Sequence, residues 1–472
     1  MGSKVISGIK WVAIERFSNQ FIQFVISIII SRIISPTDYG ILGILLVFIN
    51  IFQVFVDSGL GSSLIYFNKI KKDDLNTTFI FNLSISLFSV LLIFFTAPYI
   101  ESFYQIQDLS EYLRLSTLIL LVNSIVVVPT AILKIKLDFK SLSSANLISN
   151  ALSAIIAVYM AYTGYGVWAL IWQILSKSII LASILWMLCH WTPSFEFKKN
   201  SFLKLYKYGV NLFTTSLITK FTDEGIATII AKFLSPFNLG LFTRSGQFAN
   251  FPTSCIGSII STIMFPALSS CKKDSIKYNK LYLSSLKLQS FIIIPLYIFL
   301  AAEAKPIIII LLTEKWIDAI PIFQILCLGR ILSLLGVTIE QNLNARGYSN
   351  LCLRQQIFKL IVKITFVAIA LPFGIVAVAL GDALQTIFQF FITAFVAKRA
   401  IGYTVNDQFK ICIPFLVSGV ISGLSTYLCI YLFNNIFIQL IFPLLIGIII
   451  YLALVIIIFK QKEPLELLRK FI

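Results

Sequence analysis

Polar side chains recur at helical spacing within the first long apolar stretch of this sequence. They stand three or four residues apart, which places them on one face of a helix: Arg16, Gln20, Gln23, Ser27 and Ser31. An arginine on such a face supplies fixed positive charge and paired N–H donors, which suit the oxygens of an anion such as phosphate. The pattern therefore predicts anion binding rather than covalent chemistry.

Similar series occur in later apolar stretches, and they also include charged residues. They are Asn50, Gln53 and Asp57; Lys220, Asp223 and Glu224; Arg244 and Gln247; and Arg330 with Glu340. A charge inside a membrane costs about 2.5–3.5 kcal/mol on insertion scales, so such residues face a cavity, pair with each other or reach the interface. We predict that five cations line an anion path: Arg16, Arg32, Lys220, Arg244 and Arg330. Six further residues are predicted as polar cavity or ion-coupling groups: Gln23, Asp57, Asp223, Glu224, Gln247 and Glu340.

Three of the five cations also have a structural interpretation: Arg16, Arg32 and Lys220. Arg32 stands at the end of an apolar stretch, where a long side chain commonly reaches back to the membrane interface. Lys220 has Asp223 and Glu224 within one turn, and a neutralised structural pair is the favoured interpretation there. For all three residues a ligand role stays open as the alternative.

The cations differ in the acids available to them. Arg16 can simply pair with Asp57 or with the adjacent Glu15. Arg244 and Arg330 have no acid within one turn. Glu340 can approach Arg330 only across helices, so a cavity role is favoured for both arginines. Lys363 is interpreted as interfacial and is given no role.

Metal and redox chemistry find no support in the sequence. It contains a single histidine, His190, and no CxxC pair, so neither a metal site nor a cofactor is predicted. No nucleophile and base stand in a recognisable constellation, so we do not predict an enzyme.

The composition is that of a chain surrounded mainly by lipid. Of its 472 residues, 58% are hydrophobic and only 12% are charged, and the mean hydropathy is +0.92. A soluble chain of this length needs far more charged surface. Stretches of about 20 apolar residues, which suffice to cross the hydrocarbon core, predict an all-α integral membrane protein with about fourteen spans, near residues 11–34, 40–67, 77–98, 112–133, 142–163, 166–189, 209–234, 240–270, 283–303, 319–344, 355–372, 374–397, 411–433 and 436–459.

An internal repeat divides these spans. RIISPTDYG, beginning at Arg32, returns as KFLSPFNLG, beginning at Lys232, and both copies lie between apolar stretches. An even number of predicted spans separates the copies, so the two lobes have the same orientation and form a parallel repeat. We predict an N-terminal six-helix lobe (1–200), a related C-terminal six-helix lobe (201–400), and a terminal helix pair with a cytoplasmic tail (401–472).

Proline and glycine in these motifs have structural meanings. In each copy the proline ends the preceding helix, and Gly40 and Gly240 are predicted to allow a tight turn. Residues 57–61, Asp-Ser-Gly-Leu-Gly, predict either a local helix break with a polar floor or close helix packing through glycine.

The loops differ in charge from one side of the membrane to the other. Nearly all loop Lys and Arg residues fall on one side, while the opposite loops hold only Lys305 and Lys315. The positive-inside rule places both termini in the cytoplasm. The net charge of +17 is thereby explained by loops that face anionic lipid, and no nucleic-acid partner is predicted.

The segment from Gly8 to Lys69, with SRIISPTDYGILG and DSGLGSSLIYF, resembles a known family. It is similar to the amino-terminal signature of Wzx-type bacterial polysaccharide transporters, in the multidrug/oligosaccharidyl-lipid/polysaccharide flippase superfamily. The resemblance implies a multi-pass protein of the bacterial inner membrane that moves an undecaprenyl-pyrophosphate-linked oligosaccharide to the outer leaflet, for O-antigen, capsule or exopolysaccharide. It also implies that cavity cations attract the substrate, here matched by Arg16, Arg32, Lys220, Arg244 and Arg330. Membrane lipids and polysaccharide polymerase machinery are the other expected partners.

A mechanism and two rival functions follow from this interpretation. The lobes are expected to alternate access to a polar cavity while the last two helices guide the lipid tail. Ion coupling through Asp57, Asp223, Glu224 or Glu340 stays open beside transport driven by membrane potential alone. The rivals are a multidrug exporter of the same superfamily, with about twelve helices and an acidic cavity, and a membrane oligosaccharide polymerase, for which a large outer loop is expected.

Overall fold

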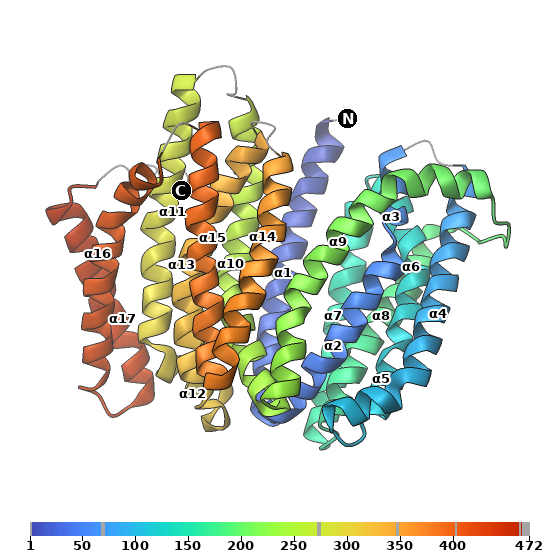
Figure 1. Ribbon diagram of the computed structural model, residues 1–472, viewed down its shortest axis with the longest axis horizontal. Helices are drawn as coiled ribbons and strands as arrows, with labels where there is room; N and C mark the ends of the chain where they lie inside the picture. Colours follow the sequence, from blue (N-terminus) through green and yellow to red (C-terminus); the bar gives the residue numbers. More distant parts are fainter. Residues whose placement is uncertain are drawn as a thin grey trace. The chain divides into compact units, whose positions relative to one another are not determined.

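The computed structural model describes the backbone of residues 2–67, 71–270, 275–345, 349–401, 404–461 and 464. Within these ranges the side chains are described from residue 18 onward, except at 222, 258–270, 275–277, 341, 344, 345, 349–354, 356, 357, 397, 399–401 and 405. The described residues are mainly helical and contain no strand (Figure 1). The prediction of an all-α protein is confirmed.

Ten helical segments of the described residues are long and apolar enough to cross a membrane. A shorter apolar helix at Ser18–Ile33 precedes them. These findings support a multi-pass membrane protein. The total of about fourteen spans and the cytoplasmic position of the termini stay predictions.

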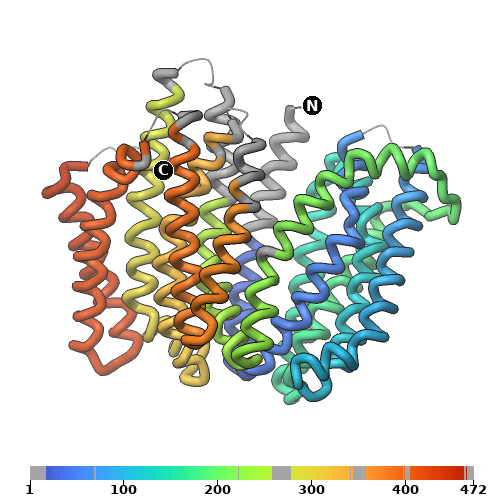
Figure 2. The backbone as a smooth tube through the Cα atoms, viewed as in Figure 1, coloured from blue at the N-terminus to red at the C-terminus, as the bar shows by residue number. Residues whose placement is uncertain are grey.

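The chain divides into two compact units, Met1–Gly240 and Leu241–Ile472, called unit 1 and unit 2 below. The predicted lobe boundaries at 200 and 400 stay predictions. Unit 1 holds nine helices in the described residues: α1 (Gly2–Ile33), α2 (Pro36–Asp57), α3 (Leu60–Phe67), α4 (Lys72–Tyr104), α5 (Leu109–Ser116), α6 (Leu118–Ile135), α7 (Phe139–Tyr162), α8 (Val167–Cys189) and α9 (Lys199–Phe233). Within it, α2 packs on α4, α6 and α9, and α7 packs on α1 and α8, so that the blue to green helices run side by side (Figure 2).

Unit 2 begins within α10 (Pro236–Ser270). Its other elements are α11 (Ser275–Ala302), α12 (Ala304–Leu312), η1 (Glu314–Trp316), α13 (Ala319–Ala345), α14 (Ser349–Ala370), η2 (Leu371–Phe373), α15 (Ile375–Ile401), α16 (Val405–Ile430), α17 (Ile436–Ala453) and η3 (Leu454–Ile458). Within unit 2, α15 packs on α13 and α14, while α11 packs on α13 and α16. Helix α17 packs on α16, so the last two long helices form a pair attached through α11.

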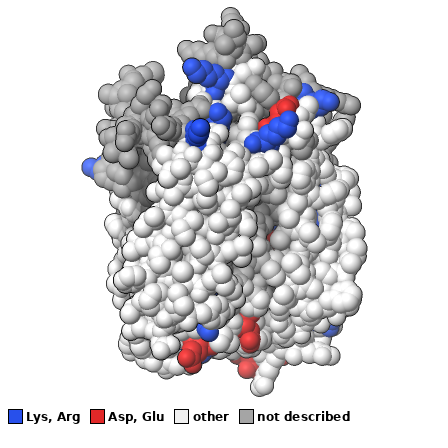
Figure 3. Space-filling model, turned by 90° about the vertical axis from the view of Figure 1, so that its left-hand side faces the viewer, with Lys and Arg blue, Asp and Glu red and all other residues white. Residues whose placement is uncertain are grey.

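Charge is unevenly distributed over the surface. The face in Figure 3 has Lys and Arg collected near one end, Asp and Glu mainly near the other, and an uncharged belt between them. Such a belt suits contact with lipid tails.

The repeated motif starts a helix in both copies. Ser35 is the N-cap of α2: its hydroxyl accepts a hydrogen bond from the Asp38 N–H at 3.2 Å and donates one to the Asp38 carboxylate at 2.8 Å. In the second copy the Ser235 hydroxyl accepts from the Asn238 N–H at 3.2 Å. A proline follows each serine at the first helical position, where its missing N–H costs nothing.

The prediction of tight turns at Gly40 and Gly240 is wrong, because both glycines lie inside helices. Their role is to let two backbones approach. A Cβ atom on Gly40 would stand 1.7 Å from the Pro236 carbonyl oxygen, and one on Gly240 would stand 1.8 Å from the Pro36 carbonyl oxygen. The two copies of the motif therefore pack on each other reciprocally at the N-terminal ends of α2 and α10.

The segment at 57–61 combines both features predicted for it. Ser58 (φ 44°) and Gly59 (φ 72°) have left-handed backbone conformations that end α2 and separate it from α3. A Cβ on Gly59 would also stand 2.3 Å from the Gly209 carbonyl oxygen of α9. Glycine is thus required here for its backbone conformation and for its small size.

A buried acid lies in the short link between α11 and α12. Glu303 is only 2% exposed, and the described residues offer its Oε1 no hydrogen-bond partner. Desolvation raises the pKa of this carboxyl from its ordinary 4.5 to about 8. Glu303 is therefore mostly neutral at pH 7, a property that the sequence pattern did not reveal.

Replacing this acid, in the variant Glu303→Gln, is expected to change how stability depends on pH. Between pH 4.5 and 8 the unfolded chain loses the proton while the folded protein keeps it, so the wild type loses stability as pH rises. At about 1.4 kcal/mol per unit of pKa, the loss approaches about 3 kcal/mol at pH 7. Thermal unfolding of the purified protein between pH 5 and 8.5 should show a flatter curve for the variant, and parallel curves would contradict the interpretation. Glu314→Gln, at an exposed acid of η1, is the matched control.

Candidate functional site

A cavity of about 700 Å³ lies within unit 1, among α2, α3, α6 and α9. Its polar lining consists of amides, hydroxyls, one carboxylate and two ammonium groups: Asn50, Gln53, Asn123, Ser62, Thr130, Thr215, Ser216, Thr219, Asp57, Lys134 and Lys220. Apolar walls come from Val127, Leu212 and Phe213 among others. A cavity of this size and mixed character is typical of sites for small organic ligands.

A chain of hydrogen bonds runs along one wall of the cavity. The Asn123 Nδ2 donates to Gln53 Oε1 at 2.7 Å, and the Gln53 Nε2 donates to Asp57 Oδ1 at 2.9 Å. Asn123 comes from α6, while Gln53 and Asp57 stand one turn apart on α2. The chain thus joins two helices and orients the amide groups that face the cavity.

A second set of contacts links α2 to α9. The Asn50 Nδ2 donates to Glu224 Oε1 at 2.8 Å, and the Lys220 Nζ stands 4.0 Å from the same oxygen. Glu224 is therefore the partner that the structural interpretation of Lys220 requires. Lys220 nevertheless lines the cavity and its side chain is 40% exposed, so the ammonium stays accessible to a ligand.

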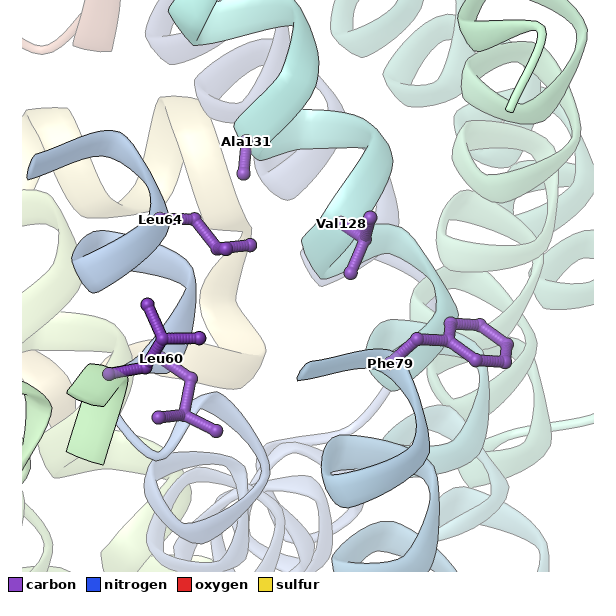
Figure 4. Close-up of a cluster of buried hydrophobic side chains, with 6 residues drawn as sticks. Leu60, Leu64, Phe79, Val128 and Ala131 are labelled. Carbon is purple, nitrogen blue, oxygen red and sulfur yellow. The ribbon is translucent and has the colours of Figure 1, made fainter. Parts of the chain in front are cut away.

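The helices behind the cavity are held by an apolar cluster. Leu60 and Leu64 of α3 pack with Phe79 of α4, with Val128 and Ala131 of α6, and with Leu205 of α9 (Figure 4). All six side chains are at most 5% exposed. This packing sets the position of α3 and α6, and with them the polar residues on their cavity faces.

A buried charge cluster lies in unit 2. The Arg330 Nη2 of α13 stands 3.4 Å from Asp382 Oδ2 of α15, and the Lys363 Nζ of α14 stands 3.8 Å from Asp382 Oδ1. Side-chain exposures are 19%, 15% and 7% for Arg330, Lys363 and Asp382. Two cations around one carboxylate leave a net positive charge, and the buried Arg330 Nε has no hydrogen-bond partner among the described residues.

This cluster corrects two sequence-based interpretations. The sequence named only Glu340 as an acid able to approach Arg330 across helices, whereas the ion pair in the structure is with Asp382. Lys363 was considered interfacial, yet it is mostly buried and shares that carboxylate. Neither pair could be predicted from the sequence, because helical periodicity relates only residues of the same helix.

The remaining predicted residues are spread over both units. Arg244 is 7% exposed in α10 and donates from Nη1 to Gln247 Oε1, so these two predicted residues are joined. Exposed positions are Gln23, Arg32, Asp223 and Gln247, and Glu340 is half-buried. Arg16 lies outside the residues whose side chains the structure describes.

Several polar residues of the cavity lining were not singled out from the sequence, among them Asn123 and Lys134. Asn123 was overlooked although it is part of an Asn-Ser pair in the otherwise apolar run LILLVNSIVVV. Lys134 stands just beyond the predicted span 112–133, whereas in the structure it lies in the last turn of α6 and lines the cavity. A search for lone amides in apolar runs is the signal that would have found Asn123.

A polar cavity among helices of membrane length is typical of membrane transporters, and sequence comparison specifies the family. The family described as "Polysaccharide biosynthesis protein" matches residues 29–321. The chain therefore belongs to this family of polysaccharide biosynthesis transporters and is a multi-pass protein of the bacterial inner membrane. The resemblance carried by its amino-terminal motifs is confirmed.

Two curated relatives carry transport or biosynthesis names. The succinoglycan biosynthesis transport protein ExoT of Rhizobium meliloti strain 1021 is 22% identical over 326 residues, which span 69% of this chain and 66% of ExoT, just under two thirds. The lipopolysaccharide biosynthesis protein WzxC of Escherichia coli K12 is 23% identical over 430 residues, which span 88% of this chain and 85% of WzxC.

Solved structures share the fold. The lipid II flippase MurJ, in an inward closed conformation, superposes with a TM-score of 0.79 at 16% identity over 97% of this chain and 99% of that chain. An inward-facing multidrug resistance MATE family transporter superposes with a TM-score of 0.63 at 16% identity, over 83% of this chain and 98% of that chain. At these identities the likeness concerns the fold alone.

Proposed function

We propose that this protein is a flippase that moves an undecaprenyl-pyrophosphate-linked oligosaccharide from the cytoplasmic to the outer leaflet, for O-antigen, capsule or exopolysaccharide export. The observation that carries the proposal is the polar cavity of about 700 Å³ lined by helices of membrane length. The names of two relatives mention succinoglycan biosynthesis transport (ExoT) and lipopolysaccharide biosynthesis (WzxC), and they support a substrate that carries saccharide.

The physical problem is the transfer of a charged, hydroxyl-rich headgroup through hydrocarbon. Removing phosphate charges from water without compensation is prohibitive. Polar groups such as those of the unit 1 cavity replace water, while Arg330 and Lys363 of unit 2 and the buried Arg244 supply positive charge. The polyprenyl tail stays in lipid, guided by the apolar faces of α16 and α17.

In this proposal the protein has about fourteen spans with both termini in the cytoplasm, and its lobes alternate access to the headgroup site. It acts as a transporter without catalytic residues, alongside the polymerase machinery that uses the exported lipid. Coupling to H⁺ or Na⁺ through Asp57, Asp223, Glu224 or Glu340 is compatible with the proposal, and so is transport driven by membrane potential.

A multidrug exporter is the second candidate, because the MATE transporter shares the fold. An acidic cavity is expected for the export of cationic drugs. The unit 1 cavity is instead lined by two lysines and one carboxylate, and the unit 2 cluster has two cations around one acid. The balance of these charges favours an anionic substrate.

Complementation of a flippase-deficient strain tests the proposal, with the variants Arg330→Ala and Arg244→Ala. We expect the wild type to restore surface polysaccharide and each variant to reduce export at least about tenfold, as for loss of a charge-assisted contact. Arg114→Ala, at an arginine of α5 with no proposed role, should leave export unchanged.

Protein levels in the membrane are measured in parallel. Normal export by both arginine variants at normal protein level would contradict the anion path. Drug resistance conferred by the wild type, without restored polysaccharide, would favour the exporter.

A further inference from the structure

We propose that the unit 1 cavity is a saccharide subsite in which Gln53, Asn123 and Asp57 bind the hydroxyl groups of a hexopyranose. The inference rests on the flippase function proposed above and names the part of the substrate that this cavity holds. It assigns the sugar to the wall formed by these three residues and leaves the pyrophosphate to the cations.

The hydrogen-bonding capacity of the three residues supports this assignment. A side-chain amide has two N–H donors and an oxygen that accepts two hydrogen bonds. In the chain Asn123 to Gln53 to Asp57, one N–H of each amide is used. The groups that remain for a ligand are the second N–H of each amide, the Asn123 oxygen and the second Asp57 oxygen. Donors and acceptors therefore alternate along this wall.

Sugar hydroxyls match that alternation better than phosphate does. Each hydroxyl both donates and accepts, so neighbouring hydroxyls can engage an amide N–H and a carbonyl or carboxylate oxygen together. A phosphate only accepts, so it would leave the acceptor atoms of this wall, the Asn123 and Asp57 oxygens, without a donor. The mutual hydrogen bonds also hold the amides in place before the ligand arrives, which lowers the entropy cost of binding.

The rest of the lining has the two other features that a sugar requires. Ser62, Thr130 and Ser216 add hydroxyl groups around the same space. Val127 and Phe213 form apolar walls that suit the C–H faces of a pyranose ring. Phe213 is itself held by an edge contact with Phe55, with ring centroids 5.3 Å apart.

Binding measurements on the purified full-length protein in lipid nanodiscs test the inference. The probes are farnesyl diphosphate and its glucosyl, galactosyl and mannosyl derivatives, so that only the sugar differs. We expect the wild type to bind each hexosyl derivative at least about tenfold more tightly than bare farnesyl diphosphate, because unpaired polar groups of the site penalise a ligand that lacks hydroxyls.

The variants Gln53→Leu and Asn123→Leu remove the proposed contacts at similar side-chain volume. In both, the preference for hexosyl derivatives should fall below about threefold while affinity for farnesyl diphosphate stays within about twofold of wild type. Gln173→Leu is the matched control, since this amide of α8 does not line the cavity. Gln53→Asn, which shortens the side chain by one methylene, is measured as well and covers the case in which a leucine variant does not fold.

Three results would overturn the inference. The first is an absence of sugar preference in the wild type, and the second is a sugar preference that is unchanged in the amide variants. The third is an affinity for the probes that depends on Na⁺ and that the variants lose while they keep their sugar preference. A wild type that binds none of the probes and does not complement the flippase-deficient strain would instead refute the flippase function itself.

Discussion

Replacing Gly40 with alanine is expected to prevent accumulation of folded protein. The added Cβ would stand 1.7 Å from the carbonyl oxygen and 2.4 Å from the carbonyl carbon of Pro236. These are backbone atoms of α10, so no side-chain rotation can relieve the overlap. The cost should exceed the about 1–3 kcal/mol typical of overpacking, and it is measured by thermal unfolding and by the yield of monodisperse protein in detergent.

The reciprocal contact provides an internal check on Gly40→Ala. A Cβ on Gly240 would stand 1.8 Å from the Pro36 carbonyl oxygen, so Gly240→Ala should have the same effect. Gly225→Ala in α9 is the control, because nothing lies within 4 Å of the added atom. That variant should be neutral or slightly stabilising, since alanine favours helix over glycine by about 1 kcal/mol. Wild-type yield and stability of Gly40→Ala would show that the two motif copies do not pack closely.

Removal of the acid in the unit 2 charge cluster, Asp382→Asn, has the second large expected effect. Asparagine has nearly the same shape but no charge, so Arg330 and Lys363 would remain buried without a counter-charge. Breaking a buried ion pair in this way costs about 3–5 kcal/mol, and partial exposure of the two cations places the expected loss near about 3 kcal/mol. Thermal unfolding of the purified protein measures it.

A second substitution tests whether the loss of stability comes from the unpaired cations. Lys363→Met added to Asp382→Asn removes one of the two unpaired cations and should recover part of the lost stability. Asp318→Asn, at an exposed acid between η1 and α13, controls for the loss of a carboxylate as such. Equal stability of wild type and Asp382→Asn would mean that Asp382 does not neutralise the two cations.

Much of the local structure was predictable because it depends on neighbouring residues. Apolar stretches of membrane length identified the helices, since a backbone in lipid satisfies its own hydrogen bonds only as helix. The proline of each Ser-Pro pair was expected to end the preceding helix, and the structure shows that it also begins the next one. The series Asn50, Gln53 and Asp57 was correctly placed on one helix face, and that face lines the unit 1 cavity.

The sequence by itself thus determined which segments are helical, how polar residues group within each helix, and the family to which the chain belongs. Only the tertiary structure decided which groups meet across helices. Asn123 joins Gln53 from 70 positions away, and Asp382 reaches Arg330 from 52. The physical reason is that periodicity relates residues a few positions apart, whereas these contacts depend on how helices pack. Gly40 is a further example, because the need for a missing side chain arises only where the Pro236 backbone approaches it.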